Sequence, residues 1–110
     1  MDKKDVQELS MKIISLAGDA FSYYFQALNE TKKCNSEKSD ELFKRGDDSL
    51  NKAHKLQTEM IVNEAKGEQS EYSIIMVHAQ DHLMNAILVK KLVKEFTEIY
   101  KKLQEGEKND

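Results

Sequence analysis

Apolar residues recur at steps of three and four along almost the whole of this 110-residue chain, and no proline interrupts them. That spacing places side chains on one face of an α-helix. A helix interior tolerates proline poorly, because the ring removes a backbone donor and clashes with the preceding turn. Three such stretches cover residues 6–28, 42–66 and 72–103. The sequence therefore predicts an all-α protein of three long helices, with no strand-like alternation and no internal repeat.

Two short polar segments separate these stretches. The first, residues 31–39, offers Asn35, Ser36 and Ser39 as N-caps of the second helix. In the second, residues 67–70 predict a turn, and Gly67 suits the left-handed position that follows a helix end. Because short connections place consecutive helices antiparallel, we expect an up-down-up three-helix bundle that forms one domain over residues 1–110.

The composition excludes several classes of protein. The formal net charge of −3 argues against a nucleic-acid binder, which would show a basic stripe. One cysteine and three histidines are too few for an internal disulfide or a structural zinc finger. The longest wholly apolar runs, residues 74–77 and 86–89, have four residues, whereas a membrane span needs roughly 20. We therefore expect a cytoplasmic protein with a reduced Cys34.

The helices carry more apolar surface than one small core needs. The first stretch adds four apolar residues outside its main stripe, and the third is apolar around most of its circumference, which is typical of a helix that is buried on all sides. A seam on the third alternates steps of four and three, as in a coiled coil: Asp81, Asn85, Leu88, Leu92, Glu95 and Ile99. We infer that the third helix packs against other subunits; a monomer with exposed apolar residues is the alternative.

The densest cluster of reactive side chains is His78-Ala79-Gln80-Asp81-His82, in the most apolar stretch. His78 and His82 share a helix face and Asp81 lies next to it, whereas Gln80 points elsewhere unless a second subunit brings it back. Buried there, these groups would need partners. Three interpretations remain open: a polar layer that fixes helix register, a metal site that lacks the Glu of the HExxH pattern, or covalent catalysis by a neutral imidazole.

The segment IIMVHAQDHLM, residues 74–84, resembles the active-site segment of the lactose/cellobiose family of enzyme IIA, components of the bacterial phosphoenolpyruvate-dependent sugar phosphotransferase system. Ala17-Gly18-Asp19-Ala20 resembles the family's early helical motif, and Ala53-His54 with Gln57-Thr58 resembles its second-helix pattern. The resemblance covers nearly the whole chain in the same order. The chain is thereby identified as a single enzyme IIA domain of the lactose/cellobiose type.

The resemblance implies that the protein is a cytoplasmic phosphotransferase. His78 would be phosphorylated by phospho-HPr and would pass the group to a cysteine of enzyme IIB, with His82 and Gln80 supporting it. The membrane enzyme IIC would complete uptake of a β-disaccharide such as cellobiose, chitobiose or lactose, which enzyme IIA does not bind directly. The alternative is a non-enzymatic, trimeric regulatory or scaffold module of the same fold.

The resemblance also implies a homotrimer of nine helices with the third helices around its axis, where three copies of Asp81 bind a divalent cation. Three carboxylates meeting in a low dielectric would repel one another strongly. Three carboxylate oxygens with three waters or amide oxygens would suit Mg²⁺, which prefers six hard ligands. Without a metal, Asp81 would have to be partly protonated or hydrogen-bonded.

Other residues receive structural interpretations. We expect His54 to be a hydrogen-bonded structural histidine of the second helix, and Cys34 to lie incidentally in the first turn. Gly18 and Gly46 fall inside predicted helices, where glycine is unfavourable relative to alanine. We expect them to allow close approach of neighbouring helices.

Overall fold

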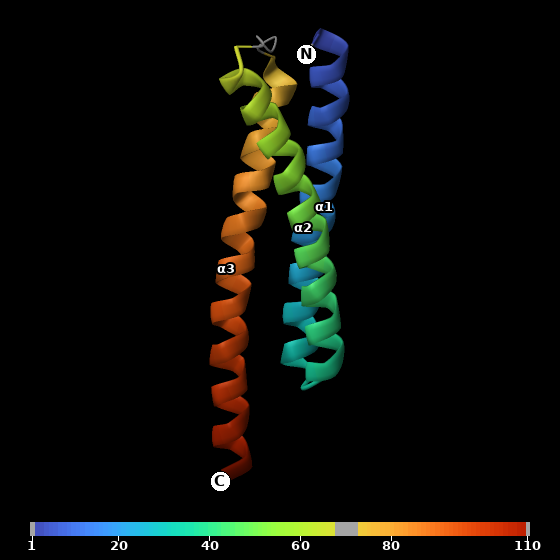
Figure 1. The fold of residues 1–110 in the computed structure, drawn as a ribbon. Coiled ribbons are helices and arrows are strands. Elements are labelled where there is room, and N and C mark those ends of the chain that lie inside the picture. The colour runs from blue at the N-terminus through green and yellow to red at the C-terminus, as the bar shows by residue number, and fades with distance from the viewer. Residues whose placement is uncertain (1, 68–72, 110) are drawn as a thin grey trace.

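The computed structural model describes residues 2–67 and 73–109, and three helices account for nearly all of them: α1 (Lys3–Lys32), α2 (Ser36–Ala65) and α3 (Ile74–Asn109) (Figure 1). No strand occurs in these two ranges. The molecule is a rod of 62 × 19 × 18 Å. The all-α class and the three predicted helices are confirmed.

Consecutive helices run antiparallel: in Figure 1, α1 runs down, α2 runs up and α3 runs down again. α1 packs along both other helices, whereas α2 and α3 contact each other much less. The C-terminal end of α3 projects beyond the connection between α1 and α2 (Figure 1). Across residues 2–67 and 73–109, none of the helices has an apolar stretch that could cross a bilayer.

The connection between α1 and α2 is shorter than predicted. Only Lys33, Cys34 and Asn35 separate the helices, and Cys34 takes a left-handed conformation with φ of 63°. Of the three expected N-caps, Asn35 occupies the position, but its side chain donates to Glu30 at 3.2 Å instead of capping α2. The turn therefore depends on Cys34, an exposed residue in a left-handed conformation that glycine adopts more readily.

Ser39, another expected N-cap, lies inside α2 and ties it to α1. Its buried hydroxyl donates to the carbonyl of Ala27 at 2.8 Å and lies 2.7 Å from the hydroxyl of Thr31. The side chain of Gln104 on α3 donates to the carbonyl of Thr31 at 2.9 Å. This hydrogen bond ties α3 to α1 one residue beyond Leu103, the last residue of the apolar pattern in the sequence. The helix itself continues to Asn109.

At the other connection, Gly67 has φ of 87°, which confirms its predicted left-handed position after α2. The remainder of the turn expected over residues 67–70, and Tyr72, lie outside the described residues.

The core lies where α1 faces both other helices. It combines small alanines, which let the helices approach closely, with larger apolar side chains at steps of three and four. Its buried members are Val6, Ile13, Ala17, Ala20, Tyr24, Leu28, Leu50, Ala53, Met60, Ala79, Leu83, Ala86 and Val93.

A polar contact at Tyr24 joins all three helices. The fully buried Tyr24 donates its hydroxyl to Asp47 Oδ1 of α2 at 2.6 Å, and Lys90 Nζ of α3 lies 3.0 Å from the same oxygen. Burial of the side chain and, to a smaller extent, the carboxylate of Asp47 raise the pKa of Tyr24 above its ordinary value. The lysine partly neutralises the carboxylate, so the buried hydroxyl is satisfied where the helices meet.

Gly46 makes room for this tyrosine. A Cβ at position 46 would lie 2.7 Å from the Tyr24 ring, closer than real Cβ atoms approach. The expected role in close packing is therefore confirmed for Gly46. For Gly18 it is wrong within the described subunit, because a Cβ there would meet nothing within 4 Å.

Candidate functional site

Two histidines of α3 contact each other one helical turn apart. The Nε2 atoms of His78 and His82 lie 3.1 Å apart, and the rings meet edge to face with centroids 4.4 Å apart. His78 is exposed and His82 is half-buried. A hydrogen bond between two such nitrogens requires one to donate and the other to accept. At least one ring is therefore neutral in this contact, and a neutral imidazole nitrogen can act as a nucleophile.

The core fixes where these histidines lie on α3. Ala79 and Leu83, each following one of the histidines in sequence, are almost fully buried against the rest of the bundle. At about 100° per residue, this anchoring leaves the histidines on one flank of α3, between its packed side and its outer side. The histidine pair is therefore held by a helix, and in the single chain the ring of His78 is exposed to solvent.

The structure separates the other predicted site residues from this pair. Gln80 is exposed and lies roughly 160° around the helix from His78, on the opposite flank. Asp81 is exposed on the outer side, between the two flanks. His78, Gln80 and Asp81 are all exposed in the single chain, so water can satisfy their hydrogen bonds. They would need hydrogen-bond partners from the protein only if another chain covered them.

The outer side of α3 is an apolar row with Asp81 within it. Seven large apolar side chains on this helix are 38–59% exposed: Val77, Met84, Leu88, Leu92, Phe96, Ile99 and Leu103. A contiguous exposed apolar surface of this kind marks an interaction site. We call this row, together with Asp81, the α3 seam. It contains four of the six coiled-coil positions that the sequence indicated, Asp81, Leu88, Leu92 and Ile99.

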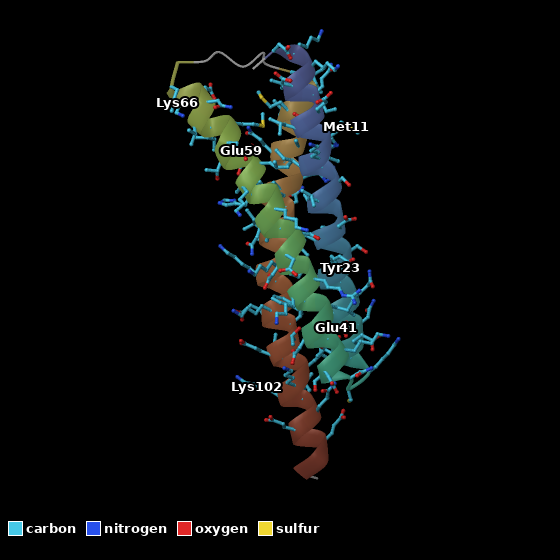
Figure 2. All side chains as sticks on the ribbon, turned by 45° about the vertical axis from the view of Figure 1, so that its right-hand side comes forward. Met11, Tyr23, Glu41, Glu59, Lys66 and Lys102 are labelled. Carbon is cyan, nitrogen blue, oxygen red and sulfur yellow. The ribbon has the colours of Figure 1, made fainter. Side chains whose placement is uncertain are left out.

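α1 also exposes apolar side chains, whereas charged residues cover much of the remaining surface. Met11, Phe21 and Phe25 are 43–55% exposed, and Figure 2 shows Met11 on the outside of the bundle. Charged side chains such as Glu41 and Lys102 project outward along the rod (Figure 2).

One chain supplies too few ligands for a metal ion. Within residues 2–67 and 73–109, no three His, Cys, Asp or Glu side chains are grouped so that they could hold a metal. Asp81 forms no ion pair in the same part of the chain. A cation bound to Asp81 would therefore need ligands from other copies of the chain or from solvent.

His54 differs from its expected structural role. The residue is exposed on α2, and its ring makes no hydrogen bond in the part of the chain that the structure describes. Only its backbone carbonyl is used, accepting from the Thr58 hydroxyl at 3.0 Å. The prediction of a hydrogen-bonded histidine was wrong. His54 follows the buried Ala53 in sequence, but the next position on a helix turns away from the packed face, so no neighbouring helix in the described ranges covers its ring. Cys34 is exposed in the first turn, as expected.

Sequence reasoning missed the part that Asp47 and Lys90 play. Neither residue stands out in the sequence, yet their ion pair connects α2 to α3, and Asp47 accepts from the buried Tyr24. No local spacing could have paired them, because they lie on different helices. Their pairing depends on how the two helices align around α1.

Comparison with known proteins points consistently to one family. Residues 8–101 match the family described as PTS system, Lactose/Cellobiose specific IIA subunit. The chain is 43% identical over 102 residues to the PTS system lactose-specific EIIA component of Staphylococcus epidermidis, with 93% of this chain and 98% of the relative covered. It is 38% identical to the lichenan-specific phosphotransferase enzyme IIA component of Bacillus subtilis, with 93% of each covered.

Solved structures agree with these sequence relatives. The PTS cellobiose-specific enzyme IIA from Bacillus anthracis superposes with a TM-score of 0.87 at 41% identity, over 90% of this chain and 91% of that one. The IIA(chitobiose)–HPr complex of the Escherichia coli N,N'-diacetylchitobiose branch superposes with a TM-score of 0.79 at 31% identity, over 90% and 96%.

Proposed function

Because this chain belongs to the lactose/cellobiose-specific IIA family of the sugar phosphotransferase system, we propose that it is a cytoplasmic phosphocarrier in which His78 receives a phosphoryl group from phospho-HPr and passes it to a cysteine of enzyme IIB. The observation that supports this most is the contact of 3.1 Å between His78 Nε2 and His82 Nε2. It supplies a nucleophilic nitrogen with a hydrogen-bond donor beside it.

The chemistry follows from that contact. With a proton on Nδ1 of His78, the lone pair on Nε2 attacks the phosphorus carried by HPr; the P–N bond to the HPr histidine breaks as the bond to Nε2 forms. The phosphoryl group takes the place of the direct contact between the rings, and the N–H of His82 donates to one of its oxygens. Such transfers depend mainly on positioning and on stabilising charge. The cysteine thiolate of enzyme IIB then attacks the same phosphorus and frees the imidazole.

We propose that the α3 seam forms the centre of a homotrimer, with three third helices side by side around the axis. In a parallel arrangement, the flank of one helix faces the opposite flank of the next. Gln80 lies on the flank opposite His78, so Gln80 of one subunit would approach His78 of its neighbour. Its amide could then donate to the phosphoryl group, which explains why Gln80 lies far from His78 in a single chain.

Asp81 fits a cation site in this trimer. It is an acidic residue among the exposed apolar side chains of the seam, and three copies would meet near the axis and repel one another. A divalent cation such as Mg²⁺, which prefers oxygen ligands and retains several waters, would supply the neutralising charge when bound. Asp81 would hold it from each subunit, and the role is structural.

The names of the relatives indicate the pathway. They refer to lactose, lichenan, cellobiose and N,N'-diacetylchitobiose, which supports uptake of a β-linked disaccharide. One structural relative was solved together with HPr, which supports HPr as the donor. Enzyme IIB is the proposed acceptor, and the membrane enzyme IIC would carry the sugar, without direct contact between the sugar and this chain.

The test is phosphorylation of the purified protein with phosphoenolpyruvate, enzyme I and HPr. We expect an acid-labile, base-stable phosphate that is absent from His78→Ala. His82→Gln is the matched variant: its amide can still donate, so the protein should become labelled, at a rate reduced roughly tenfold by the poorer hydrogen bond. A trimer that acquires no label would favour the non-enzymatic scaffold, and a fully labelled His78→Ala protein would refute His78 as the nucleophile.

A further inference from the structure

A hollow of about 380 Å³ lies between α2 and α3. We call it the His54 hollow. Its walls and floor include residues from both helices: Leu50, His54, Ile87, Lys90, Lys91 and Lys94. It exists because α2 and α3 each pack on α1 and touch each other little.

The His54 hollow carries an excess of positive charge. No carboxylate lines it. Lys90 is paired with Asp47 at 3.0 Å, but Lys91 and Lys94 form no ion pair within residues 2–67 and 73–109. The exposed ring of His54 adds a hydrogen-bonding group that the fold does not use among those residues. A neighbouring hollow further along α3 also includes Lys94 but contains Asp47 and Glu98, so its charge is more balanced.

The floor of the hollow is apolar. Leu50 is buried and Ile87 is half-buried, and the two supply the apolar part of the lining. The volume is within the range of roughly 300–1,000 Å³ that is typical of sites for small molecules. Converging donors above an apolar surface suit a ligand with an anionic end and a less polar body.

The hollow lies on the side of α3 away from its own His78. Lys94 lies roughly 140° around α3 from Asp81, and Ile87 lies roughly 180° from His78. Ile87 also lies within about 20° of Gln80 around α3, so the hollow faces α2 and the flank that the proposed trimer places beside the neighbouring subunit.

We propose that the His54 hollow binds a small organic phosphate. Ammonium groups bind phosphate as point charges, and charge-assisted hydrogen bonds are the stronger kind. Lys91 and Lys94 supply the charge, His54 contributes a ring N–H, and the floor formed by Leu50 and Ile87 receives the body of the ligand.

The experiment is a titration of the full chain with phenyl phosphate at low ionic strength, where screening is weak. It is followed by NMR of the histidine rings and backbone amides, with inorganic phosphate and phenol titrated in parallel. We expect phenyl phosphate to shift the His54 ring signal and the amides of residues 91–94, to bind more tightly than inorganic phosphate, and phenol to give no shift.

Variants test the charges. The double variant K91Q/K94Q should weaken binding of phenyl phosphate by at least roughly tenfold. The matched control K4Q/K12Q removes the same charge from exposed positions on α1 and should bind normally. Absence of a shift at His54, equal binding of inorganic phosphate, or unchanged affinity of K91Q/K94Q would overturn the proposal. So would tighter binding of an acidic peptide at the same residues, which would indicate a surface for a protein.

Discussion

Replacing Gly46 with alanine should destabilise the subunit, although alanine is ordinarily the better helix former. The new Cβ would lie 2.7, 2.9 and 3.0 Å from three atoms of the Tyr24 ring. An ordinary contact begins at 3.4 Å, so either the ring or α2 would have to move by about 0.7 Å to restore one. The ring has little freedom, because it is fully buried, hydrogen-bonded to Asp47 and packed against Phe43 with centroids 4.9 Å apart.

Two opposing effects decide the magnitude. Overpacking a core costs about 1–3 kcal/mol, whereas glycine to alanine in a helix interior gains up to about 1 kcal/mol. The rigid surroundings of Tyr24 place the overpacking cost toward the upper end of its range. We therefore expect the free energy of unfolding to fall by about 1–2 kcal/mol in Gly46→Ala.

The assay is urea denaturation followed by circular dichroism at one fixed protein concentration. Gly18→Ala is the matched control, because its Cβ would meet nothing within 4 Å; it should stabilise the protein by about 0.5–1 kcal/mol. Tyr24→Leu combined with Gly46→Ala should recover part of the loss attributed to the clash, as a coupling of about 1 kcal/mol or more. A Gly46→Ala protein as stable as Gly18→Ala would refute the packing argument.

Three further predictions concern Tyr24 and the α3 seam. Tyr24→Phe should lower the free energy of unfolding by about 1.5 kcal/mol at pH 7. Because folding raises the pKa of Tyr24, the stability that this hydroxyl contributes is complete below pH about 10 and falls above it. Urea midpoints measured across that pH range should therefore fall in the wild type relative to the variant. Leu92→Glu should weaken self-association at least roughly tenfold by placing a charge in an apolar contact, whereas sedimentation of Lys52→Glu should be unchanged. Asp81→Leu should remove the bound divalent ion and alter the stability of the trimer; unaltered metal content by elemental analysis would contradict the assignment.

The sequence was sufficient for the helices because each depends on local periodicity. Steps of three and four predicted all three, and Gly67 marked the end of α2. The boundaries of the first turn were less predictable. Ser39 resembles an N-cap in the sequence, but within the fold its hydroxyl is more useful against Ala27 and Thr31 on α1.

The site was predictable only in part, for a related reason. The spacing of four residues placed His78 and His82 on one face, and their contact confirms this. It also indicated that Gln80 points elsewhere, which the structure bears out. What periodicity could not show is contact between helices: the exposed ring of His54 above a hollow, and the pairing of Asp47 with Lys90. Such contacts depend on how α2 and α3 align around α1.

The central claim is that His78 carries a phosphoryl group between two partners, and a chase experiment tests it most directly. The protein is labelled with radioactive phosphate through phospho-HPr, freed of HPr and mixed with purified enzyme IIB. The account predicts that the label leaves His78 and appears on enzyme IIB, and that an enzyme IIB variant without its reactive cysteine leaves it in place. Label that remains on His78 in the presence of intact enzyme IIB, or that maps to another residue, would contradict the account.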